Sequence, residues 1–194
     1  MVAKQLEITD RDALILVDVQ VDFCPGGALA VAEGDRIVPV LNRLLPRFRT
    51  VVATKDWHPA DHCSFQAQGG PWPPHCVQGT PGAEYHAGLE LPAEVIHVRK
   101  ACEADTECFD NFAGRPDLAA ELTRRGIERV FVGGLATDYC VLNTVLGARQ
   151  RGFEVIALLD AMRAVEVTEG DGQRALEEMR RAGAALVRAE DIDG

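Results

Sequence analysis

Six short apolar runs, separated by segments with helical periodicity, restrict most strongly what this chain can fold into. The runs lie at 13–19, 50–54, 95–98, 129–133, 154–159 and 184–187. Several show almost no alternation of apolar and polar residues, which is typical of strands buried on both faces. Helical patterns lie between them at 35–48, 117–125, 138–151 and 171–181. Strands that alternate with helices predict an α/β fold with three layers and a mainly parallel sheet of about six strands.

The length of 194 residues favours a single domain. We expect residues 1–11 to form an N-terminal tail and residues 12–194 to form the domain. Within it, the segment 55–92 has no clear period and is rich in Pro, Gly, His and Trp. A loop this long inside a compact domain is usually functional.

The formal net charge of −10 makes the chain a poor partner for nucleic-acid phosphates and for anionic lipid. The N-terminus has no secretory signal pattern, and no apolar run approaches the roughly 20 residues that cross a bilayer. These features predict a cytoplasmic protein that binds neither nucleic acid nor membrane. A homo-oligomer is left open.

Six cysteines are present, and Cys140 has the position that best suits chemistry. It follows the fourth predicted strand and a turn of small residues, in the first turn of a predicted helix. Backbone N–H groups and the helix dipole favour a thiolate there and can hold an oxyanion. The alternative is a buried structural cysteine. We interpret the other five in that second way: Cys24, Cys63, Cys76, Cys102 and Cys108.

Two charged residues lie where predicted strands end. Asp18 closes the first buried run, and a carboxylate there costs free energy unless it has a partner. Lys100 closes the third run. Because ligands of open parallel sheets bind outside the carboxyl ends of strands, Asp18 is placed for such a site. Beside Asp18, Lys100 could hold the carboxylate and stabilise a developing negative charge. A structural carboxylate and a surface lysine are the alternative interpretation.

The segment 55–92 contains residues of the kinds that bind metals. Asp56 and His58 lie two apart, and His75 follows at a distance. Two imidazoles and one carboxylate leave open positions for water, as in a catalytic metal site. Histidine-rich loops without a metal also occur, so both interpretations stand at this point.

Four motifs together resemble the nicotinamidase branch of the isochorismatase-like hydrolases. They are ALILVDVQVDF at 13–23, KDWHP at 55–59, WPPHCV at 72–77 and GLATDYCV at 134–141. The first and last motifs resemble the superfamily as a whole. The middle two, which carry Asp56, His58 and His75, resemble the metal-bearing branch. The resemblance implies an isochorismatase-like fold and hydrolysis of nicotinamide, with pyrazinamide as a second substrate.

The resemblance also implies roles for individual residues. Asp18, Lys100 and Cys140 would form a catalytic triad. The backbone N–H groups of Ala136 and Cys140 would form an oxyanion hole, after a cis peptide bond between Leu135 and Ala136.

A metal site and a substrate pocket are implied in the same way. Asp56, His58 and His75 would bind one divalent ion, with zinc favoured over iron or manganese, and His62 is left open. Four residues would contact the substrate: Phe23, Trp72, Leu135 and Ala136.

One region departs from the family pattern and affects substrate range. After Lys100 the chain has Ala101 and then Phe-Asp-Asn-Phe at 109–112, where relatives have other residues. The nearest alternative is another amidohydrolase of the same superfamily that acts on a carbamoyl or ureido compound, although the metal-ligand motifs argue against it. A vinyl-ether hydrolase of the isochorismatase type and a binding module without activity are more distant ones.

Overall fold

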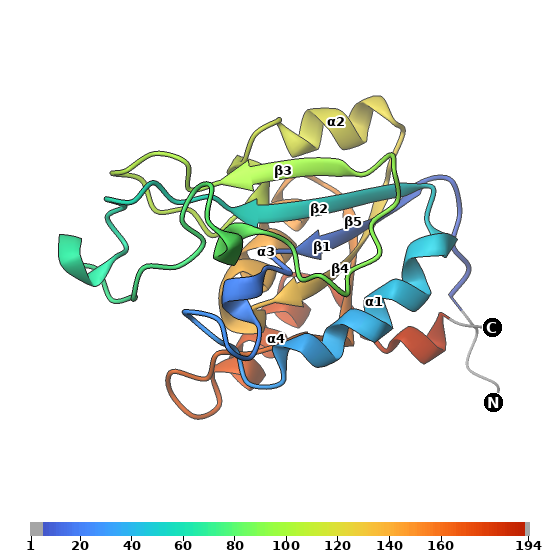
Figure 1. Cartoon of the computed structure of the whole chain (residues 1–194). Helices are drawn as coiled ribbons and strands as arrows, with labels where there is room; N and C mark the ends of the chain where they lie inside the picture. Colours follow the sequence, from blue (N-terminus) through green and yellow to red (C-terminus); the bar gives the residue numbers. More distant parts are fainter. Residues whose placement is uncertain (1–5, 193–194) are drawn as a thin grey trace.

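The computed structural model describes residues 6–192, so residues 1–5 of the predicted tail and residues 193–194 of the predicted domain lie outside it. Within the described part, six parallel strands form one sheet in the order β3-β2-β1-β4-β5-β6 (Figure 1). The strands are β1 (Asp12–Val17), β2 (Thr50–Asp56), β3 (Ile96–Lys100), β4 (Arg129–Leu135), β5 (Glu154–Arg163) and β6 (Ala185–Val187). The predicted α/β fold with a parallel sheet is confirmed. No helix between residues 6 and 192 has the length and apolar character needed to cross a membrane.

Helices cover both faces of the sheet and produce the three layers (Figure 1). They are α1 (Val38–Leu44), α2 (Leu118–Arg124), α3 (Leu142–Gln150) and α4 (Asp171–Arg181). Leu14 and Leu16 of β1 pack in the core that contains α1, whereas Ile15 and Val17 pack in a second core with the other three helices. Alternate residues of β1 thus enter both cores, which explains why its sequence is apolar without alternation.

The second strand is longer than its apolar run. The run predicts a strand at 50–54 and a loop from Lys55, but β2 continues to Asp56. Asp56 lies opposite Lys100 in the parallel pairing of β2 with β3. Pairing with β3 extends the strand through polar residues, and an apolar pattern cannot reveal this. Strand β5 likewise runs beyond its apolar pattern, to Arg163.

Two predicted helices are less regular than their patterns indicate. The segment 35–48 consists of a 3-10 turn (Gly34–Ile37), α1 and a second 3-10 turn (Leu45–Arg47). Prolines lie near the starts of α1 and of the last turn, and a proline cannot donate the N–H bond that continues a helix. The helix predicted at 138–151 begins as a π-helical turn (Thr137–Val141) before α3.

The order of the strands opens a crevice at one edge of the sheet. Strands β2 and β3 extend from one side of β1, whereas β4, β5 and β6 extend from the other. The chain leaves β1 towards β2 and leaves β4 towards β5, in opposite directions along the sheet. In open parallel sheets, ligands bind at the carboxyl ends of two such neighbouring strands.

Candidate active site

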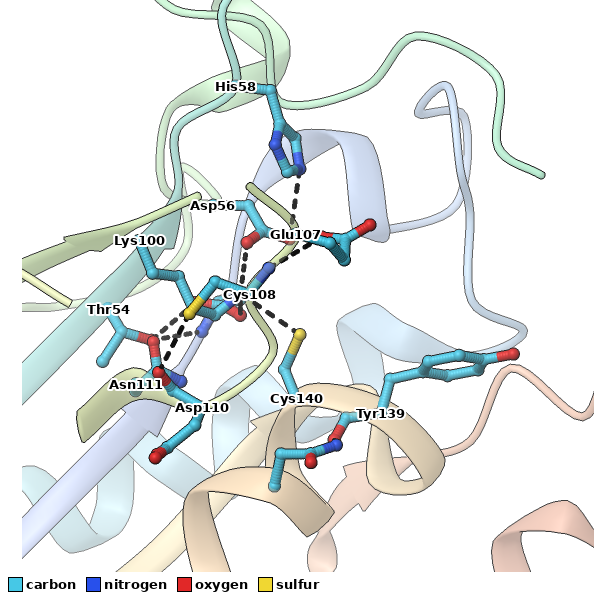
Figure 2. A network of polar contacts seen from close by, with 12 residues as sticks. Thr54, Asp56, His58, Lys100, Glu107, Cys108, Asp110, Asn111, Tyr139 and Cys140 are labelled. Carbon is cyan, nitrogen blue, oxygen red and sulfur yellow. Dashed lines mark hydrogen bonds and ion pairs between the residues drawn. The ribbon is translucent and has the colours of Figure 1, made fainter. Parts of the chain in front are cut away.

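Four chemically active side chains meet at the carboxyl ends of the central strands, and Figure 2 shows three of them from close by. Asp18 follows β1, Asp56 ends β2, Lys100 ends β3, and Cys140 lies in the π-helical turn after β4. All four are buried. One ligand atom each from Asp18, Asp56 and Cys140 lie within 4.8 Å of one another. The predicted convergence of strand ends is therefore observed.

The Lys100 ammonium group lies at the centre of this cluster. Its Nζ is 3.1 Å from Asp18 Oδ2 and 3.3 Å from Cys140 Sγ. It also donates to the Asp56 carboxylate. A buried ammonium is stable only when paired, and here two carboxylates and a thiol surround it. Lys100 is thus not the surface charge that its strand-end position alone allowed.

The pKa values of these groups follow from burial and from their mutual charges. Burial raises the pKa of the Cys140 thiol well above its usual value, although Lys100 acts against this. Burial likewise raises the pKa of the Asp18 carboxyl. Burial acts to lower the pKa of Lys100, but the surrounding carboxylates outweigh it and raise that pKa. Cys140 therefore rests as a thiol beside a charged ammonium and needs a base to become a nucleophile.

Thr54 holds the Asp18 carboxyl in place. Its hydroxyl donates to Asp18 Oδ1 at 2.6 Å and accepts from the Asp18 backbone N–H at 3.1 Å. Asp18 has a left-handed backbone, with φ at +47°, which turns the chain out of β1 directly at this residue. The second oxygen, Oδ2, has no hydrogen-bond partner in the described part of the chain and faces Lys100.

The turn that carries Cys140 winds closely around one carbonyl. The N–H groups of Tyr139 and Val141 both donate to the Ala136 oxygen, at 3.1 and 3.0 Å. The peptide bond between Leu135 and Ala136 is cis, as the resemblance implies. The oxyanion hole formed by the Ala136 and Cys140 N–H groups stays a prediction.

Asp56, His58 and His75 form a second cluster beside the first. Their ligand atoms lie within 4.8 Å of one another, and all three residues are buried. The His58 and His75 rings meet edge to face with centroids 4.9 Å apart. Burial would raise the pKa of Asp56, but Lys100 and His58 outweigh it and lower that pKa, so the carboxyl is ionised.

The donor atoms of this cluster fit a divalent metal ion. His75 Nδ1 lies 2.8 Å from the Pro73 carbonyl oxygen. When Nδ1 carries the proton and donates it to this oxygen, the lone pair of Nε2 is available to bind a metal ion. His58 Nδ1 is buried without a hydrogen-bond partner among the described residues. With the ionised Asp56, two imidazoles supply the ligand types that suit zinc, iron or manganese.

His62, which the sequence leaves open, is placed differently. Its Nδ1 lies 2.7 Å from Ser64 Oγ, and its Nε2 lies 3.1 Å from the Thr106 carbonyl oxygen. Both ring nitrogens are therefore already engaged by the protein. The His62 ring lies tilted beside the His58 ring, with centroids 4.1 Å apart, but it does not belong to the ligand cluster.

Comparison with known proteins agrees with this geometry. The isochorismatase domain family matches residues 12–191. The chain belongs to the isochorismatase family. It is 38% identical to the nicotinamidase of Acinetobacter baylyi, with 99% of each chain covered.

Solved structures of the family resemble the whole fold. A pyrazinamidase of Pyrococcus horikoshii in complex with zinc matches at 46% identity and a TM-score of 0.86, covering 92% of this chain and 99% of that one. PnC1 from L. infantum in complex with nicotinate matches at 38% identity and a TM-score of 0.90, covering 97% and 98%.

In this member of the isochorismatase family, aromatic side chains line a cleft above the metal-ligand cluster. The lining residues are Leu29, Asp56, His58, Trp72, His75, Glu107, Phe109, Tyr139 and Val165. Tyr139 meets Trp72 edge to face with centroids 5.3 Å apart and packs near Phe109 at 5.6 Å. Trp72 is thus part of the cleft wall, and its contact with substrate stays a prediction. Phe23 is buried and packs against His75, at 5.5 Å between centroids.

Sequence reasoning missed several residues of this site. Thr54 lies in the apolar run 50–54, and nothing in the local sequence marked it as a residue of the site. Glu107, Phe109 and Tyr139 enter the cleft through the path of their loop and turn, which no local pattern reveals. The departure from the family pattern at Ala101 and at 109–112 was the one available pointer, and of these three residues it included only Phe109.

All six cysteines are free thiols. Cys24 and Cys76 are buried, as a small apolar residue would be. Cys63, Cys102 and Cys108 are partly exposed, so the interpretation as buried residues is wrong for these three. They lie on the long loop and on the segment after β3, where apolar packing is incomplete.

Proposed function

We propose that this chain is a nicotinamidase that converts nicotinamide to nicotinic acid and ammonia, and acts on pyrazinamide as well. Residues 12–194 would form one hydrolase domain, with the metal ligands on the 55–92 segment. The reaction would serve NAD salvage in the cytoplasm. The observation that carries the proposal is the position of Lys100 Nζ, within 3.3 Å of both the Asp18 carboxylate and the Cys140 thiol.

The first half of the reaction would form a thioester on Cys140. Asp18, held by Thr54, takes the proton from the thiol, and the sulfur attacks the carboxamide carbon. Lys100 stabilises the negative charge that develops beside it. Asp18 then returns the proton to the departing nitrogen, which leaves as ammonia. This order suits a thiol whose pKa is raised by burial, because the thiolate forms only when the adjacent base acts.

The second half would hydrolyse the thioester. Asp18, again ionised, takes a proton from the attacking water and returns it to the Cys140 sulfur as the carbon–sulfur bond breaks, so that nicotinic acid leaves and the thiol is restored. The N–H groups of Ala136 and Cys140 would hold the oxyanion in both halves. Contacts from Phe23, Trp72, Leu135 and Ala136 would orient the ring, since a flat ring packs well against aromatic faces.

Asp56, His58 and His75 would hold the divalent ion, with zinc as the favoured metal. When bound, it supplies a Lewis acid that orients the substrate and polarises water. Support for zinc comes from the pyrazinamidase of Pyrococcus horikoshii, whose structure is a zinc complex. Removing the metal with a chelator should sharply lower turnover, and adding zinc should restore it. An unchanged rate in the rigorously metal-free protein would contradict this assignment.

A substrate panel tests the proposal against its nearest alternative. Purified protein should release ammonia from nicotinamide and pyrazinamide, and far more slowly from N-carbamoyl and ureido compounds. The reverse preference would make the chain an amidohydrolase of the carbamoyl type. Release of ammonia from none of these compounds would leave a binding protein without activity.

A further inference from the structure

We propose that the chain has a second ligand site, for a small phosphorylated compound, on the face of the sheet opposite Cys140. A cavity of about 510 Å³ opens there, lined by Lys55, Glu84, Tyr85, His97, Arg99 and Arg115. Its size falls within the roughly 300–1,000 Å³ typical of small-molecule sites. Nicotinamide is uncharged, so this site would serve another ligand than the proposed substrate.

The alternation of side chains along two strands separates this cavity from the active site. Lys55 lies opposite Arg99 in the pairing of β2 with β3, and Asp56 lies opposite Lys100 one residue later. Successive side chains of a strand point to opposite faces of the sheet. Lys55 and Arg99 therefore project away from the face that carries Asp56 and Lys100.

Positive charge gathers in this cavity although the chain as a whole carries −10. Three permanent cations, Lys55, Arg99 and Arg115, line it together with one carboxylate, Glu84. Lys55 Nζ lies 2.5 Å from Glu84 Oε2, so that pair is neutral. The two arginines contribute the remaining charge.

The guanidinium group of Arg99 has N–H donors that are available to a ligand. Its guanidinium lies over the Trp57 ring, 4.4 Å from the centroid, and no carboxylate between residues 6 and 192 pairs with it. Among the described residues, the Arg115 guanidinium forms an ion pair only with Glu103, at 3.7 Å, and 81% of its side chain is exposed. The two arginines are tied together by backbone hydrogen bonds of 2.9 and 2.8 Å, so the backbone holds them side by side.

Lys55 adds a buried cation to the wall of the cavity. Its side chain is 9% exposed and its Nζ lies 4.3 Å from the centre of the Tyr85 ring. Its anionic partner Glu84 is 57% exposed and thus partly solvated. Two arginines and the Lys55–Glu84 pair line one cavity. The two guanidinium groups match a phosphate dianion, because arginine forks bind phosphate oxygens in pairs.

A titration of the labelled full-length protein followed by nuclear magnetic resonance tests this site. Glycerol phosphate is added at constant ionic strength, and sodium chloride serves as the salt control. Chemical-shift changes that saturate with ligand concentration are expected at the backbone amides of Lys55, Arg99 and Arg115. Arg99→Gln and Arg115→Gln should each weaken binding about tenfold or more, since each removes a charge-assisted hydrogen-bond donor. Arg11→Gln removes an exposed arginine paired with Glu128 and should leave the affinity unchanged.

Three results would overturn the proposal. Chemical-shift changes that do not saturate, or that sodium chloride reproduces, would show that the cavity has no specific phosphate site and that the added salt only screens its surface charge. Shifts centred on His75, abolished by His75→Ala but not by Arg99→Gln, would place the anion at the metal cluster. A stable dimer in sedimentation whose cross-links join Arg99 of two copies would make the face an interface. None of these results bears on the release of ammonia from nicotinamide.

Discussion

Replacing Thr54 by valine should slow catalysis without disturbing the fold. The substitution keeps the β-branched shape of the side chain but removes the hydroxyl that joins Asp18 Oδ1 at 2.6 Å and the Asp18 N–H at 3.1 Å. Thr54 touches no substrate in the proposed reaction, so it is a positioning residue that acts through Asp18.

The magnitude follows from the charge on Asp18. A hydrogen bond to a charged group contributes about 1.5–3 kcal/mol, and its loss disfavours the ionised carboxylate by that amount. Fewer molecules then hold Asp18 as a base at neutral pH, so kcat/KM should fall about 10–100-fold. The pKa of Asp18 should rise further, because a bond to its charged form is lost. The acidic limb of the pH–rate profile should therefore move to higher pH.

Steady-state kinetics with nicotinamide across a pH series measures both effects. KM should change little, because the ring contacts lie elsewhere in the cleft. Thr50→Val is the matched control, since Thr50 is a buried threonine at the other end of β2, opposite Ala13 and away from Asp18. The role of Thr54 would be refuted if kcat/KM fell while the acidic limb of the pH–rate profile stayed in place. Equal losses of kcat/KM in the Thr54 and Thr50 variants would refute it as well.

Two further comparisons test the end of β4, which leads to Cys140, and the metal cluster. Gly134→Ala should abolish stable folding in urea unfolding experiments, because its Cβ would lie 2.0 Å from the Val17 oxygen at a φ of +136°. Gly152→Ala, with φ at +88° and nothing within 4 Å, should cost only about 1–2 kcal/mol; equal losses would contradict the packing argument. His75→Ala should lower the metal content found by elemental analysis, whereas His62→Ala should retain it. Loss of metal from the His62 variant would make that residue a ligand.

The sequence was most informative where buried strands end. Because parallel strands end at a common edge, the pattern of apolar runs indicated sites for Asp18 and Cys140. Lys100 joined them through the family resemblance, since its strand-end position alone favoured a surface charge. Asp56 was predicted as a ligand but assigned to a loop, since polar residues at a strand end do not show which neighbour they pair with.

Long-range contacts set the limit of prediction. The Thr106 carbonyl, one of the two partners of His62, was not predictable because it lies 44 residues away in the chain. The aromatic wall beside Trp72 was missed for a similar reason: Phe109 and Tyr139 come from separate segments that only the fold brings together. Local periodicity therefore reveals strands and their ends, but not which loop side chains share a pocket.

The thiol nucleophile is tested most directly by mass spectrometry of the protein quenched with acid during turnover. With nicotinamide present, a nicotinoyl group should appear on the peptide that contains Cys140, and Cys140→Ala should show neither this adduct nor release of ammonia. Rapid turnover by the Cys140→Ala variant, or an adduct on a different residue, would contradict a thiol nucleophile held between Asp18 and Lys100.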